Sequence, residues 1–155
     1  MGTRIQDKDH GYKAMRQRMK QMAGSYTKVG VQENSRDQDG VSDLVIIAAS
    51  NEFGTETIPE RSFVRSTFEE NREKLAEISA AEGDAILTGK KDVKTSLALM
   101  GEFHAGQIQA KIHSHPPPAN APSTIKRKGS SGTLVDSGNL AQSIRHVEII
   151  EGRAQ

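Results

Sequence analysis

Three consecutive prolines, followed by a basic stretch that ends in glycine, constrain this sequence more than any other feature. Proline has no backbone N–H and disfavours helix in the residue before it, so the prolines at 116–118 must end any helix that reaches His115. The residues that follow, as far as Gly132, are rich in Pro, Ser, Lys and Gly and cannot form a core of their own. The composition predicts an extended, basic and proline-rich arm over residues 114–133 that packs poorly in the free monomer.

The chain as a whole is polar for a folded domain. Apolar residues make up 34% of its 155 residues, whereas globular domains usually hold roughly 45–50% when glycine is counted. The 21 basic and 20 acidic residues nearly cancel, so the net charge gives no argument for binding to nucleic acid or to a membrane. We predict a single domain, residues 1–155, whose stability is partly supplied by neighbouring subunits.

Apolar residues at helical spacing mark the N-terminal region, residues 1–24. Separations of 3, 4 and 3 residues relate Tyr12, Met15, Met19 and Met22. This pattern predicts an amphipathic helix over residues 10–23. We favour a helix laid on a sheet over a calmodulin-target or membrane-surface helix, because the apolar face is only one stripe wide.

Two longer helices are predicted in the middle of the chain. The first begins near residue 61 or 62 and runs to about residue 81, with an extension as far as the helix stop at Gly89. Its apolar face comprises Val64, Phe68, Leu75 and Ile78. The second is capped by Asp92 and reaches His113. Its apolar face comprises Val93, Leu97, Met100, His104, Ile108 and Ile112.

Three short segments favour strands, at residues 27–32, 42–50 and 143–150. The second is the most strongly β-branched and apolar of the three. A polar turn region separates the first two, which predicts a hairpin, and the third is predicted to pair antiparallel with it. The expected fold class is α+β, with a small, mainly antiparallel sheet packed by two or three helices and an extended proline-rich arm.

The sequence offers little for catalysis or for metal binding. It has no cysteine and no Gly-x-Ser-x-Gly nucleophile motif. His113 and His115, with His104 nearby, lack a suitably spaced carboxylate, and a helix C-terminus favours histidine without any metal. We predict a protein that is not an enzyme and has no catalytic residue, cofactor, metal or small-molecule substrate. The longest apolar run, residues 44–49, is too short to span a membrane, so no membrane partner is expected.

The basic run at 126–128 is the strongest candidate for contact with nucleic acid. In one interpretation it contacts the phosphates of DNA that passes through a channel. In the other it keeps the arm soluble or pairs with acidic groups on a neighbouring subunit. Three charges in a nearly neutral chain are a weak electrostatic footprint, so the second interpretation is favoured.

Five segments, in order along nearly the whole chain, resemble one known family. They are Val29–Val31, Asn51–Thr55, Ile58–Arg65, Pro116–Gly129 and Leu134–Leu140, the last leading into Ser143-Ile144. In this order they resemble the tail-completion or head–tail joining proteins of tailed bacteriophages, a family of minor tail components and virion-morphogenesis proteins. The chain departs from that family at Ser62, where a second proline is common, and at Ser137, where threonine is common.

The resemblance implies a structural subunit of a neck ring that completes the tail and joins it to the head around the DNA channel. It implies four kinds of partner: further copies of the chain, the head-completion or connector protein, the tail-terminator or tube protein, and genomic DNA. It also implies location in the neck or tail of a virion after synthesis in the cytoplasm of the bacterial host. The alternatives are a tail-terminator subunit that caps the tail tube and, in a different class, a small nucleic-acid-binding module.

Two sets of residues follow from these segments. The candidates for assembly contacts are Pro116, Pro117, Pro118, Pro122, Lys126, Arg127 and Lys128. The predicted structural anchors are Phe53, Pro59, Arg61, Phe63, Phe68, Asp136, Gly138 and Leu140. Among these anchors, Pro59 and Arg61 are expected to start the second helix. The two phenylalanines at 63 and 68 are expected to bury its first turns against the sheet.

Overall fold

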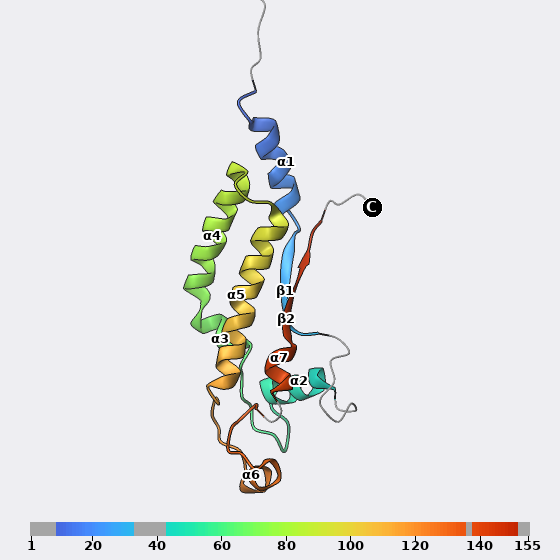
Figure 1. Ribbon diagram of the computed structural model, residues 1–155, viewed down its shortest axis with the longest axis vertical. Helices are drawn as coiled ribbons and strands as arrows, with labels where there is room; N and C mark the ends of the chain where they lie inside the picture. The colour runs from blue at the N-terminus through green and yellow to red at the C-terminus, as the bar shows by residue number, and fades with distance from the viewer. Residues whose placement is uncertain (1–8, 33–42, 136–137, 152–155) are drawn as a thin grey trace, which may run out of the picture.

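The computed structural model describes residues 9–32, 43–135 and 138–151, and within them it confirms the α+β class. Helices dominate, and one two-stranded antiparallel sheet accompanies them (Figure 1). The elements in chain order are α1 Tyr12–Met22, β1 Tyr26–Val31, α2 Leu44–Phe53, α3 Arg65–Glu70, α4 Arg72–Thr88, α5 Val93–His113, α6 Pro122–Lys128, α7 Asn139–Ser143 and β2 Ile144–Ile149. The molecule is elongated, with α1 at one end and α6 at the other.

Helix α5 is the central element of the fold, with α4 on one side and the sheet on the other (Figure 1). The predicted cap is confirmed, because the Asp92 carboxylate accepts a hydrogen bond from the Thr95 N–H at 2.8 Å. The helix approaches the sheet at Gly101, where an added Cβ would lie 2.7 Å from the Thr27 hydroxyl oxygen and from the His146 Cβ. The predicted apolar stripe is therefore only partly right. Its central positions are replaced in the core by the small residues Ser96, Gly101 and Ala105.

The two strands predicted at 27–32 and 143–150 are confirmed, and they pair with each other. Tyr26 lies opposite Ile149, and Val31 lies opposite Ile144, in an antiparallel register. No other strand joins them within the described part of the chain. The sheet therefore consists of one long-range ribbon rather than the predicted hairpin with a third partner.

The strand predicted at 42–50 is wrong, because these residues lie largely in helix α2. The Asp43 carboxylate accepts a hydrogen bond from the Val45 N–H at 2.9 Å and so caps the helix. The buried residues of α2 are Leu44, Ala48 and Glu52, which are spaced four apart on one helical face. A short run in which every residue is apolar hides this period, and Glu52, which reveals it, lies beyond the run. The predicted hairpin loop falls mostly at 33–42, outside the described residues.

The helix predicted from residue 61 starts later and is divided. It begins at Arg65 as α3 and is interrupted at Asn71, whose φ and ψ of −106° and 9° are not helical. It resumes as α4 and continues to the predicted stop at Gly89, which adopts a left-handed φ of 79°. Pro59 therefore lies outside the helix, on exposed chain, and does not start it as predicted.

The hydrophobic core gathers beside the junction of α7 and β2. Its members are Ala48, Phe63, Ala105, Ile108, Ile112, Leu140, Ala141 and Ile144. Phe63 and Leu140 are confirmed as buried anchors. The burial predicted for Phe68 is wrong, since it is 47% exposed; its ring forms an edge-to-face pair with the His104 ring, 6.0 Å away between centroids. Phe53 is 68% exposed and is not a core anchor either.

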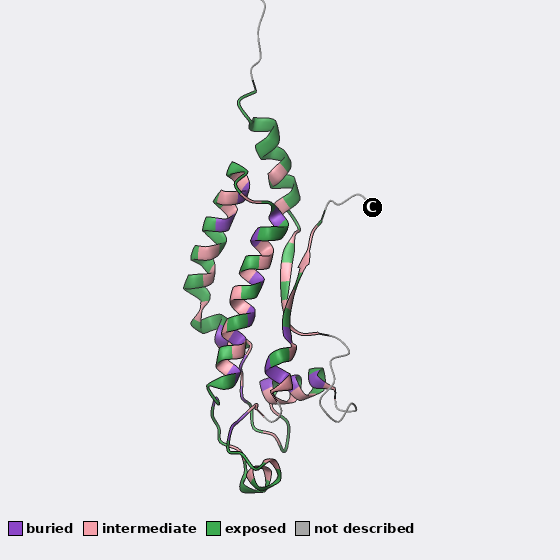
Figure 2. Cartoon of the chain, viewed as in Figure 1, coloured by how far each residue is buried: buried purple, intermediate pink, exposed green. Residues whose placement is uncertain are grey.

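The N-terminal helix and the last helical turn complete the fold. α1 is confirmed as a helix, but none of its residues is buried (Figure 2), so it does not lie on the sheet as predicted. α7 follows Gly138, whose left-handed φ of 83° starts the predicted turn of helix. Asp136, the predicted cap, lies outside the described residues.

Candidate assembly interface

The arm, residues 114–133, forms the end of the molecule farthest from α1 (Figure 1). It is not extended throughout, as the composition predicted, because its middle forms α6. Pro122 occupies the first turn of α6, where the missing N–H costs nothing, and Gly129 ends the helix in a left-handed conformation. The prolines at 116–118 precede α6 and keep the chain out of helix, with a cis peptide between the second and third.

The chain that enters the arm, residues 116–120, and the chain that leaves it, residues 130–133, are joined by hydrogen bonds. We call these two segments the legs of the arm. The Asn120 side chain donates to the Gly132 carbonyl at 2.9 Å, and the Thr133 hydroxyl donates to the Pro116 carbonyl at 2.8 Å. Thr133 and Pro116 are both buried. The prediction of a poorly packed arm is therefore wrong for its base, where side chains satisfy the backbone groups that the prolines leave unpaired.

Arg61 attaches the arm to the body of the protein. Its guanidinium donates from Nε to the Pro118 carbonyl at 2.7 Å and from Nη2 to the Ala119 carbonyl at 3.1 Å. A third nitrogen reaches the Asn51 side-chain oxygen at 3.4 Å. Only 5% of Arg61 is exposed, and burial lowers its pKa, but a guanidinium stays charged at any physiological pH. The predicted anchor role of Arg61 thus has a specific form, because it joins three distant segments of the chain.

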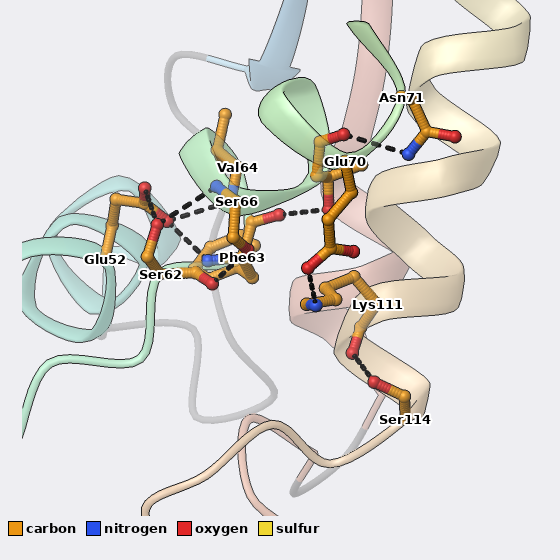
Figure 3. Close-up of polar contacts among 10 residues, drawn as sticks. Glu52, Ser62, Phe63, Val64, Ser66, Glu70, Asn71, Lys111 and Ser114 are labelled. Atoms are coloured by element: carbon orange, nitrogen blue, oxygen red, sulfur yellow. Dashed lines mark hydrogen bonds and ion pairs between the residues drawn. The ribbon is translucent and has the colours of Figure 1, made fainter. Parts of the chain in front are cut away.

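Glu52 anchors the start of α3 (Figure 3). Its carboxylate accepts backbone hydrogen bonds from Phe63, Val64 and Arg65 at 2.7, 2.9 and 3.0 Å, and a fourth from the Ser62 hydroxyl at 2.8 Å. Burial on its own would raise the pKa of Glu52, but these four bonds stabilise the charged form and hold the pKa below its usual value. A negative charge at a helix N-terminus is favourable as well.

Glu52 lies in one of the segments that resemble the family, but no role was predicted for it from the sequence. The residue at the start of α3 gives a signal for this role, because it cannot cap the helix. α3 has no side-chain cap of its own at Val64, so its first N–H groups need an acceptor from elsewhere in the chain. An acidic residue that ends an otherwise apolar helical face is a suitable source of that acceptor.

The predicted basic run divides into one inward and two outward side chains. Lys128 points back to the arm, and its ammonium donates to the Val135 carbonyl at 2.6 Å and the Gly132 carbonyl at 3.2 Å. Lys126 and Arg127 are exposed and form no hydrogen bond or ion pair within the described chain. The run is therefore not a uniform basic patch.

A hollow of ≈ 370 Å³ lies between α2, residues 57–61 and α6, and we call it the arm hollow. Its aliphatic wall comprises Leu44, Ile47, Ile58, Leu134 and Leu140. Its charged lining residues within the described chain are Arg61, Arg127 and Lys128, and none of its described lining residues is acidic. This surface is concave, partly apolar and positively charged, which suits binding of another chain more than chemistry on a small molecule.

The histidines do not converge on a metal site. His115 bonds through Nδ1 to the Thr133 carbonyl oxygen at 3.2 Å, whereas His104 lies in α5 against Phe68, where burial lowers its pKa. Among the described residues, no group of three or more His, Cys, Asp or Glu side chains is placed to hold a metal ion. In the same part of the chain, none of the helices combines the length and the apolar character needed to cross a membrane. No family model, curated protein or solved structure was found to match this chain.

Proposed function

We propose that the chain is a structural subunit of a ring in the neck of a tailed-phage particle, where it completes the tail and joins it to the head. The observation that carries this proposal is the set of bonds made by Arg61. Three of the segments that resemble the family, at 51–55, 58–65 and 116–129, meet at this one side chain. Segments that share a family pattern and meet in space support a common role.

Exposed apolar side chains at both ends of the molecule also support an assembly role. At the end that carries α2, Ile46 and Phe53 are 65% and 68% exposed. At the opposite end, Tyr12 and Met19 of α1 are 64% and 53% exposed. Single exposed apolar side chains are common on protein surfaces, and others, such as Leu99 in α5 and Val147 in β2, are exposed as well. Those at the two ends are available for contact with the layers above and below in the proposed ring.

In the proposed mechanism, weak contacts become strong through ring closure. Copies of the chain meet head to tail around the DNA channel, and the ring docks on the connector above and the tail terminator or tube below. Each contact is weak when it forms singly, but the closed ring makes all of them at once. The protein is then a virion component made in the host cytoplasm, and its action is assembly rather than catalysis.

Replacing the tip of the arm tests this proposal. Deletion of the whole arm is unsuitable, because Arg61 would lose its carbonyl partners. Residues 121–129 can instead be replaced by a short Gly-Ser linker, since Asn120 already bonds to the carbonyl groups of residues 131 and 132. The variant lacks α6 and the two bonds of Lys128, so its circular dichroism spectrum should lose only the contribution of that short helix, and the protein should still unfold in one cooperative transition.

The readout is head–tail joining in an assembly extract that lacks the native protein. Wild-type protein should restore joined particles in electron micrographs, and the tip variant should leave heads and tails separate. Normal joining by the tip variant would contradict the arm as an assembly contact. Normal joining without any added protein would contradict the proposed function itself.

Two alternatives have distinct outcomes. A tail-terminator subunit would, when absent, leave the length of the tail tube uncontrolled, whereas a joining subunit would leave tails of normal length. A nucleic-acid-binding module would bind duplex DNA in isolation, with an affinity that falls steeply as salt increases. The split of the basic run into one inward and two outward side chains weakens the second alternative.

A further inference from the structure

We propose that the arm hollow binds an extended acidic segment of a partner protein, with an apolar side chain inside the hollow and a carboxylate at Arg127. This inference deepens the proposed function, on which it rests, because it names the kind of segment that the arm end of the subunit receives. The observations behind it are the positive charge of the hollow, its aliphatic lining and the hydrogen bonds that fix the arm; none of these is taken from the family resemblance.

The positive charge at the hollow is not neutralised within the described chain. Arg61 is buried, yet all its hydrogen bonds go to neutral carbonyl or amide oxygens. Lys128 likewise bonds only to carbonyl oxygens. Arg127 has no partner at all among the described residues. Buried or half-buried charges are usually paired, so the absence of an acidic partner for Arg61 and Lys128 among the described residues favours an anionic ligand, and the exposed Arg127 adds a third positive charge at the same hollow.

Arg127 is the residue that can contact this ligand directly. Three of the five N–H groups of Arg61 are already used, two of them by the arm, and the residue is only 5% exposed, so we assign it a contribution of charge rather than the direct contact. Arg127 lines the hollow with a planar guanidinium that no described residue engages, and such a group can bind a carboxylate through two parallel bonds.

The apolar wall distinguishes a protein segment from a nucleic acid. Five of the residues that line the hollow are large aliphatic ones, and they come from α2, the 57–61 segment, residue 134 and α7. Its volume of ≈ 370 Å³ lies in the range of clefts that enclose small ligands or side chains, roughly 300–1,000 Å³. A sugar–phosphate backbone has no apolar group that would pack against aliphatic side chains. An acidic peptide with a leucine-like side chain complements both the aliphatic and the positively charged residues of the hollow.

The closed arm makes the site ready for binding. Bonds from Asn120 and Thr133 fix the two legs of the arm, and Arg61 fixes the arm to the body. α6 is therefore held across from α2 without any partner present. A preformed site avoids much of the ordering cost that a flexible strap would pay on binding.

Synthetic peptides provide the probe. The acidic peptide acetyl-Glu-Leu-Asp-Leu-Glu-amide is titrated into the full-length protein by isothermal calorimetry at near-physiological salt. Its two controls replace both leucines by serine or all three acids by lysine. We expect the acidic leucine peptide to bind at least about tenfold more tightly than either control, because each control lacks one half of the complementarity.

Lys126 supplies a matched control for Arg127. The two residues are adjacent in α6, exposed and unpaired, but only Arg127 lines the hollow. R127E should weaken the acidic peptide at least about tenfold, whereas K126E should change its dissociation constant less than about threefold, because only Arg127 lines the hollow and the exposed charge at 126 is screened by solvent and salt. Both side chains are exposed, so neither variant should alter the circular dichroism spectrum.

Several outcomes would overturn the proposal. Failure of the acidic peptide to bind at millimolar concentration is one, and equal losses in K126E and R127E are another. Tighter binding of duplex DNA than of the peptide, lost equally in the two variants, would assign the run to phosphates instead. Binding that appears only in D136N would mean that a carboxylate of the same chain occupies the hollow. Peptide binding and head–tail joining are separate readouts, so failure of this inference and failure of the proposed function are distinguishable.

Discussion

The arm end and the α1 end of this molecule are built in opposite ways. At the arm end, irregular chain is held by the buried polar residues Glu52 and Arg61, each bonded to backbone groups distant in sequence. At the other end, α1 is a regular amphipathic helix with no buried residue. At the arm end, buried polar side chains hold the irregular chain to the body of the protein, whereas the regular apolar periodicity of α1 does not bury any of its residues.

The difference has a simple origin in backbone hydrogen bonding. A helix satisfies most of its own N–H and C=O groups, so α1 needs little from its neighbours. It lies against α4 and α5, and within the described chain a side-chain hydrogen bond runs from Arg18 to the Leu87 carbonyl at 3.0 Å. An irregular segment must find external partners for the same groups. Glu52 supplies acceptors and Arg61 supplies donors, so both must be buried beside the segments that they serve.

The largest expected effect separates two phenylalanines near the arm end. Phe63→Ala should lower the free energy of unfolding by about 3–5 kcal/mol, because the side chain is fully buried and its loss leaves a cavity. Phe68→Ala, the matched control, should cost no more than about 1.5 kcal/mol, because its ring is half exposed. Urea unfolding followed by circular dichroism measures both, and equal costs would contradict the division between core and surface drawn here.

A smaller loss is expected from removing the anchor of α3. Glu52→Ala leaves the N–H groups of residues 63–65 without their acceptor, which should cost about 2–3 kcal/mol. Glu56→Ala is the control, because Glu56 is exposed, and its effect should stay within about 0.5 kcal/mol. A cost below about 1 kcal/mol for Glu52→Ala would show that α3 does not depend on this anchor.

The same anchor predicts a pH dependence of stability. The folded protein holds the pKa of Glu52 below its ordinary value of 4.5, so the unfolded chain binds the proton first as the pH falls. The stabilisation by Glu52 is present above pH 4.5 and is lost as the pH falls through the lowered pKa. Glu52→Gln should therefore differ most from wild type near neutral pH and converge with it in acid. If the free energies of unfolding of wild type and Glu52→Gln differ by the same amount down to about pH 3, the difference arises from the packing of the side chain and not from its charge.

The predictable part of the fold is the part in which local pattern and environment agree. The Asp92 cap, the stop at Gly89 and both strands of the ribbon were readable because cap chemistry, glycine and β-branched residues act locally. The burial of Phe63 was predictable from the sequence around it as well. α2 was not predictable in this way, because a run of apolar residues is compatible with strand and helix, and the decision came from Glu52 and its distant partners.

The candidate site was predictable as a set of segments but not as an arrangement. The proline-rich composition correctly marked the arm as chain without a core of its own, yet it suggested a loose strap. What closes the arm is a small number of long-range bonds, from Arg61 to residues 118 and 119 and from Thr133 to Pro116. Such bonds join residues far apart in sequence, so no local sequence pattern predicts them.

The smallest expected effect concerns α1. Met19→Ala should change the free energy of unfolding by less than about 0.5 kcal/mol in dilute protein, because the side chain is 53% exposed and contributes little to the monomer. If α1 instead contacts another copy or another layer, the same substitution should matter only when that contact forms. Measuring the unfolding midpoint over a hundredfold range of protein concentration separates the two cases, since only an associating wild type gains stability with concentration. A gain in wild type that Met19→Ala removes would show that the unburied helix, as we propose for the hollow at the arm end, is completed by a neighbour. A large cost at every concentration would instead mean that α1 is packed within the monomer, and the contrast between the two ends would fail.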